Sequence, residues 1–210
     1  MASDQLWTLL WQAALVGLSI AAPVGPIGLL TIQRSLNQGA AAGLATGLGA
    51  ALADAVYGGV AAFGVAGAMA VLSAARLPLV LLGSGFLLWL AWRTWQAPLA
   101  QAAAAPSART HLLRCLAGTF VLTLSNPATI LSFVAVFGAL AGSWGQASAA
   151  TAWWLVSGVF VGSALWWLLL SQVTSRMGSR FDPTWRGRVN RISAMLLAAF
   201  ALWQLGALLC

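Results

Sequence analysis

The chain has 210 residues, of which 61% are hydrophobic and only 6% are charged. A soluble domain typically carries about 25% charged residues, so this composition excludes an ordinary soluble enzyme, a disordered protein and a classical nucleic-acid binder, and it indicates an integral membrane protein. The net charge of +7 comes from ten arginines without any lysine, and these lie in short gaps between apolar runs, where they set orientation in the membrane.

Six membrane-spanning helices are predicted from the runs without charge, because a spanning helix needs about 20 predominantly apolar residues. The first run has no basic segment before it, which favours a spanning helix over a cleaved signal peptide. The long uncharged stretch between Arg114 and Arg176 is expected to hold two helices, separated at residues 141–146. The predicted helices cover residues 6–33, 40–66, 76–95, 115–140, 150–173 and 190–209.

The arginines between these helices are unevenly distributed. Nine of the ten arginines lie in the gaps after the first, third and fifth helices, and only Arg76 lies in the gap after the second. Cytoplasmic loops of membrane proteins carry the excess of positive residues. We therefore expect both termini outside the cytoplasm and the loops around Arg109 and Arg186 inside it.

A segment rich in Ala, Pro and Ser covers residues 96–114 and is expected to be a flexible linker. It divides a single transmembrane domain, residues 1–210, into halves of about 1–95 and 115–210. Each half has three predicted helices, so the second half enters the membrane from the opposite side. Equivalent helices are then inverted, an arrangement found in many secondary transporters.

Proline and glycine interrupt the first and the fourth predicted helices. Proline removes a backbone donor and clashes with the preceding turn, and in lipid the freed backbone groups must face protein or water. Matching breaks in two inverted halves point to a midplane binding site, although a pair of packing kinks is the alternative. The expected fold class is thus an all-α membrane protein with six helices in two inverted halves. The candidate site residues at the breaks are Pro23, Gly25, Pro26 and Gly28, and Ser125, Asn126 and Pro127.

Asp54 is the only acidic residue deep within an apolar run. A charged carboxylate at mid-bilayer costs about 2.5–3.5 kcal/mol on insertion scales, so it favours a functional role. Asp54 would carry a proton or pair with a cationic group of a substrate; the alternative is a structural carboxyl bonded to the second break. Tyr57, one turn further along, is expected to line the same cavity. Ser163 lies in a stretch of the fifth helix that repeats the spacing around Asp54, and it is the candidate counterpart in the second half.

Two further classes of function fit the sequence less well. A membrane thiol-redox carrier would need Cys115 and Cys210 to meet, but they are expected at opposite membrane faces, and a disulfide needs Cα atoms within about 7 Å. A metal or other ion transporter would need several oxygen ligands, whereas the chain has one central Asp, no Glu and a lone His111. No catalytic residue, metal ligand or cofactor site is predicted.

Small residues repeat along the second predicted helix, where Gly39, Gly43 and Gly47 share one face. Small side chains let membrane helices approach closely. The pattern therefore predicts tight packing within the chain or, alternatively, the contact face of a homodimer.

Four motifs together are similar to a known family: Pro23-Val24-Gly25-Pro26, the segment Gln33-Arg34-Ser35-Leu36-Asn37-Gln38-Gly39, the stretch from Gly49 to Asp54, and Asn126-Pro127. With these motifs, its size and its six-helix layout, the whole chain resembles the lysine-exporter (LysE/RhtB) family of amino-acid efflux proteins. The commonest form of the first motif has Pro, Gly and Pro in succession, whereas Val24 intervenes here, so no particular cargo is implied.

The resemblance implies a secondary exporter of amino acids or related small zwitterionic metabolites in the bacterial plasma (inner) membrane. Export would be coupled to the entry of protons. The expected partners are the small-molecule substrate, protons and the lipid bilayer, with no nucleic acid.

Overall fold

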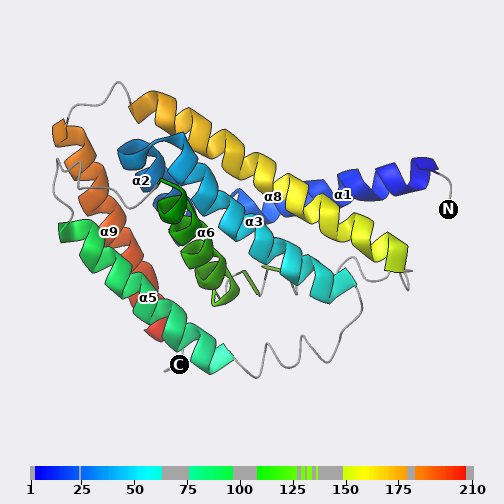
Figure 1. The fold of residues 1–210 in the computed structure, drawn as a ribbon. Helices are drawn as coiled ribbons and strands as arrows, with labels where there is room; N and C mark the ends of the chain where they lie inside the picture. The colour runs from blue at the N-terminus through cyan, green and yellow to red at the C-terminus, as the bar shows by residue number, and fades with distance from the viewer. Residues whose placement is uncertain are drawn as a thin grey trace.

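The structure is a computed structural model that describes residues 3–23, 25–62, 76–96, 108–126, 129–130, 132–133, 136, 149–178 and 183–206. Regular secondary structure in these residues is helical throughout (Figure 1). The helices are α1 (Ser3–Ala21), α2 (Pro26–Gln38), α3 (Ala40–Ala62), α5 (Arg76–Gln96), α6 (Ala108–Leu124), α8 (Ala149–Gly178) and α9 (Pro183–Gly206).

Each of the six predicted helices has a described counterpart, but several bounds differ. α6 begins at Ala108, so residues 108–114 are helical and do not belong to the predicted linker. α8 continues to Gly178, and α9 begins at Pro183. The sequence prediction placed helix ends where arginines appear. Arginine is a good helix former, so a charge marks where the apolar run ends and not where the helix ends.

The helices form two groups joined by α2. In one group α1 and α3 lie along α8, and α6 packs against α3; in the other, α5 and α9 lie side by side (Figure 1). The short helix α2 contacts α3, α8 and α9. It therefore links the group of α1, α3, α6 and α8 to the pair of α5 and α9.

Glycines allow the closest approaches between helices. A Cβ atom at Gly162 of α8 would collide with the backbone carbonyl of Ala14 in α1. Within α3, a Cβ at Gly43 would meet the side chain of Ser35, and one at Gly47 would meet Trp167. Gly43 and Gly47 thus serve packing inside the chain, the first of the two alternatives predicted for them.

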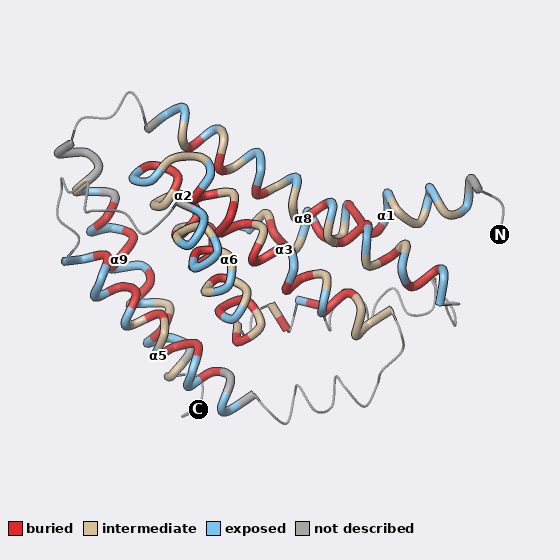
Figure 2. The backbone as a smooth tube through the Cα atoms, viewed as in Figure 1, coloured by how far each residue is buried: buried red, intermediate tan, exposed pale blue. Residues whose placement is uncertain are grey.

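The distribution of side chains suits a lipid environment. Large apolar residues are exposed on the outer faces, among them Trp11, Leu82 and Trp203, while serines and threonines such as Thr46 and Thr119 are buried (Figure 2). By length and composition, α3 and most of α8 qualify as membrane spans among the described residues, and the bent pair of α1 and α2 qualifies as a third.

Candidate functional site

The first helix break is present where the prolines predict it. The axes of Gln5–Ala21 and Pro26–Gln38 differ by 82°. Between them the Gly25 N–H donates to the Pro23 carbonyl at 2.9 Å, which closes a tight turn. Gly25 is the N-cap of α2 and offers no side chain to cap it, and Pro26 occupies the first turn, where its missing N–H costs nothing.

The second break follows α6 and is organised by Asn126. The Asn126 N–H donates to the Thr123 carbonyl at 3.1 Å, and the Asn126 carbonyl accepts from the N–H groups of Thr129 and Ile130. Helical residues resume at Thr129. Pro127 lies outside the described residues, so its predicted place in the break is not described here.

Tyr57 binds the end of α6, where the second break begins. Its hydroxyl donates to the Leu124 carbonyl, at the end of α6, at 2.7 Å. The ring is buried and lies 5.4 Å from that of Phe133, measured between centroids. Tyr57 therefore stabilises the broken helix, and it is not among the described residues that line the cavity beside Asp54.

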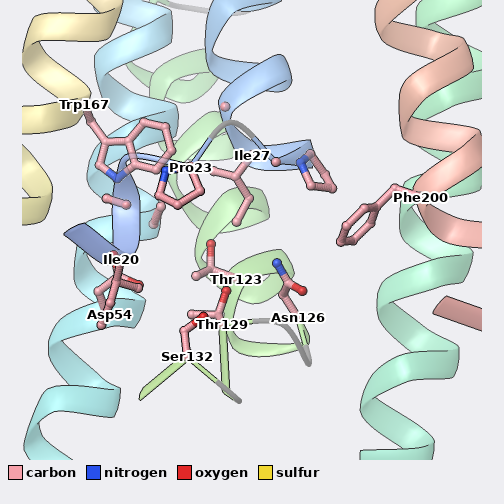
Figure 3. A pocket seen from close by; sticks show the side chains of 15 residues that line it. Ile20, Pro23, Ile27, Asp54, Thr123, Asn126, Thr129, Ser132, Trp167 and Phe200 are labelled. Carbon is pink, nitrogen blue, oxygen red and sulfur yellow. The ribbon is translucent and has the colours of Figure 1, made fainter. Parts of the chain in front are cut away.

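Both breaks border one cavity of about 260 Å³ (Figure 3). From the first break, Pro23, Gly25, Pro26 and Gly28 line it, and from the second break Asn126 does. The other lining residues come from α1, α2, α3, α6, α8, α9 and the segment after α6: Ile20, Ala21, Ile27, Ala50, Asp54, Thr123, Thr129, Ser132, Trp167 and Phe200. The two breaks and Asp54 thus meet, as the sequence predicts.

Asp54 is held at the cavity by a chain of two hydrogen bonds. The Ser163 hydroxyl donates to Asp54 Oδ2 at 2.7 Å, and Trp167 Nε1 donates to Ser163 Oγ at 3.1 Å. Asp54 is only 3% exposed, and Ser163 is fully buried. The predicted candidate Ser163 therefore contacts Asp54 directly and does not line the cavity itself.

Ser125 does not line this cavity either, but it borders a small neighbouring pocket together with Pro26 and Asn126. It is buried directly after the end of α6, close to α5, where a Cβ at Gly83 would lie 3.1 Å from the Ser125 carbonyl oxygen. Its position indicates a packing role between α5 and α6.

Several lining residues were missed by sequence reasoning. Trp167, Thr123 and Phe200 have no local signal, because the mostly apolar stretches of helix around them do not show which face turns inward. Thr129 and Ser132 do have one, since they are polar residues three apart and directly follow the second break.

The electrostatics of the cavity are simple. Asp54 is the only charged side chain among the described residues that line it, and hydroxyl and amide groups supply the other polar atoms. The uncapped N-terminus of α2 adds backbone N–H groups and a partial positive charge. In the described part of the chain, no three His, Cys, Asp or Glu side chains gather as a metal site. One wall can therefore accept a cation, and the α2 terminus can accept an anion.

Comparisons with known proteins also point to a membrane protein of a translocator family. The chain matches the family of LysE type translocators over residues 18–206, a range that contains every lining residue of the cavity. It is also similar to the uncharacterized membrane protein YahN of Escherichia coli (strain K12), with 30% identity over 173 residues, which cover 81% of this chain and 75% of the relative. No solved structure matches the chain.

Proposed function

The chain belongs to the LysE type translocator family, and from this premise we propose that it is a secondary exporter of amino acids or related small zwitterionic metabolites. The observation that carries the proposal is the shared cavity of about 260 Å³ between the two helix breaks, with Asp54 in its wall. Pockets for drug-sized ligands span about 300–1,000 Å³, so this volume suits a small metabolite.

A zwitterion fits the charges of the cavity. Its carboxylate would bind at the N-terminus of α2, where unbonded amides and the helix dipole favour an anion. Its ammonium group would pair with Asp54. The apolar wall of Ile20, Ile27 and Trp167 would contact the remainder of the substrate.

Proton entry would drive export. Asp54 is buried in an apolar span, and the Ser163 hydroxyl that donates to it is neutral. Substrate and proton would compete for the same carboxylate, which couples the two movements. One proton that moves down 100 mV supplies about 2.3 kcal/mol.

The proposed arrangement in the membrane keeps the six spans of the sequence prediction. Residues 1–210 form one domain with two inverted three-helix halves and both termini outside the inner membrane. The described counterparts of all six predicted helices support this arrangement, as does the unequal arginine distribution. The breaks at equivalent positions of the two halves also support it.

An efflux screen tests the proposed function. Cells that express the chain are loaded with each of the twenty radiolabelled proteinogenic amino acids, and efflux is compared with that of cells expressing Asp54→Asn. Loss of one charge-assisted interaction, worth about 1.5–3 kcal/mol, predicts that export of the accepted amino acid falls about 10- to 100-fold.

Membrane abundance and the elution profile of the purified variant are the controls for folding. Asp54→Asn keeps the size of the side chain and removes its charge. Export that stays unchanged in this variant contradicts both roles of Asp54, and a variant that no longer folds supports the structural alternative.

A further inference from the structure

The last two turns of α2 hold the surrounding helices by polar side chains. The amide of Gln33 and the hydroxyl of Thr94 in α5 lie 3.3 Å apart, and Asn37 Nδ2 donates to Asn190 Oδ1 in α9 at 2.7 Å. Both pairs join neutral side chains, and hydrogen bonds between neighbouring helices are a sufficient role for them. Arg34 is different, because it brings a full positive charge into the same region.

Arg34 was assigned to a loop by the arginine distribution, but the structure places it inside α2, half-buried between α3 and α6. Its Nη1 atom donates to Thr46 Oγ1 at 2.9 Å, and lies 3.3 Å from both the Cys115 carbonyl oxygen and Thr119 Oγ1. The hydroxyls of Thr46 and Thr119 donate their own hydrogens to carbonyls one turn back. Their oxygens therefore face Arg34 as acceptors.

Among the described residues, only the Nη1 atom of Arg34 has hydrogen-bond partners. A guanidinium group has five N–H donors, and all three contacts above use Nη1. No carboxylate among the described side chains pairs with Arg34; Asp54 is bonded to Ser163 instead. Neutral oxygens leave the positive charge uncompensated, and the Nε and Nη2 donors are arranged as a carboxylate requires for a bidentate contact.

Arg34 does not line the cavity, but its partners Thr119 and Thr46 lie on the same helices as two residues that do. Thr123, which lines the cavity, lies one turn beyond Thr119 on α6, and Asp54 lies two turns beyond Thr46 on α3. Eight residues of helix correspond to about 12 Å. An amino acid therefore cannot contact Arg34 and Asp54 with its two α-groups at once.

We propose that Arg34 is a second carboxylate-binding position, on the α2 C-terminal side of the cavity. It binds the carboxylate of the substrate before the substrate reaches Asp54, and it selects for molecules with a free carboxylate. The α2 N-terminus then takes over the carboxylate inside the cavity. The order in which the substrate meets Arg34 and then Asp54 rests on the proposed export function. The binding of a carboxylate by Arg34 does not depend on that function.

Thermal unfolding of the detergent-purified protein tests the binding. The probe is sodium propionate at about 100 mM, with propionamide as the uncharged analogue and sodium chloride to match ionic strength. A ligand at about ten times its Kd raises Tm by a few degrees, so we expect about 3–5 °C with propionate for the wild type. Arg34→Gln should lose the part of this shift that Arg34 contributes, so its shift should be clearly smaller than that of the wild type.

Two variants separate Arg34 from other positive or anion-binding groups. Arg114 is exposed on α6, and Arg114→Gln is the matched control that should keep the full shift. Arg34→Lys keeps the charge without the planar fork, so it should bind propionate more weakly than the wild type; this comparison also serves if Arg34→Gln does not fold.

A propionate shift that is as large in Arg34→Gln as in the wild type, or that propionamide reproduces in the wild type, overturns the inference. If Arg34→Gln cannot be purified, an Arg34→Lys variant with the same propionate shift as the wild type overturns the inference as well. If the propionate shift depends on Arg34 while the efflux screen finds no exported amino acid, the binding position stands and the proposed export function fails.

Discussion

At the scale of single residues, the hydrogen bonds around Asp54 decide what the carboxyl can do. Ser163 is fully buried, and it is the donor to Asp54 Oδ2. A carboxylate in an apolar environment is stabilised by each donor that it keeps. Trp167, which lines the cavity, donates a hydrogen bond to Ser163 and so orients the hydroxyl that donates to Asp54.

Ser163→Ala should therefore reduce both stability and export. Removal of the donor leaves a buried carboxyl oxygen without this bond, which lowers the free energy of unfolding by about 1–3 kcal/mol. Thermal unfolding of the purified protein and efflux of the amino acid found in the screen are the two measurements. Ser157→Ala makes the same change at an exposed position of the same helix and should leave both unchanged. A Ser163→Ala protein as stable and active as the wild type contradicts the role of this bond.

At the scale of helices, two kinds of small residue act differently. Gly25 belongs to a break, where a turn of the backbone follows a proline and opens the cavity. Gly158 and Gly162 belong to an unbroken helix, where they let the backbone of α8 approach that of α1. The first kind shapes the site, and the second keeps the helices around it in contact.

Gly162→Ala should separate α8 from α1. The new Cβ would collide with the backbone carbonyl of Ala14, which no side-chain rotation relieves. Overpacking of this type costs about 1–3 kcal/mol, to be measured as a lower Tm of the purified protein. At Gly85 of α5 an added Cβ meets no atom within 4 Å, so Gly85→Ala should leave Tm unchanged or raise it. Equal effects of the two substitutions would show that the α1–α8 contact is not tight.

At the scale of the whole molecule, α2 links the two groups of helices. Its N-terminus lines the cavity and its C-terminal turns bind α3, α5, α6 and α9. Gly39, with φ of 90°, then reverses the chain directly into α3, a conformation that side chains with a Cβ rarely adopt. A movement of α2 would therefore change the cavity and the helix contacts together.

The proposed orientation predicts which side of the membrane each loop faces. With Cys115 and Cys210 replaced by serine, Ser107→Cys should react with a membrane-impermeant maleimide only from the cytoplasmic side. Gln146→Cys, in the gap after the fourth predicted helix, should react only from outside. The opposite pattern for both positions would reverse the orientation, while leaving the cavity and its chemistry as described.

The sequence by itself determined the membrane class, the positions of both breaks and the place of Asp54 within an apolar helix. These features depend on local chemistry, since a proline lacks its N–H and a buried carboxylate is costly in any apolar surroundings. Only the tertiary structure decided that Trp167 lines the cavity, that Tyr57 bonds to the second break and that Arg34 lies between helices. These outcomes depend on how each helix is rotated about its axis. Helices that are apolar on every side carry no pattern that fixes this rotation, so contacts with neighbouring helices fix it instead.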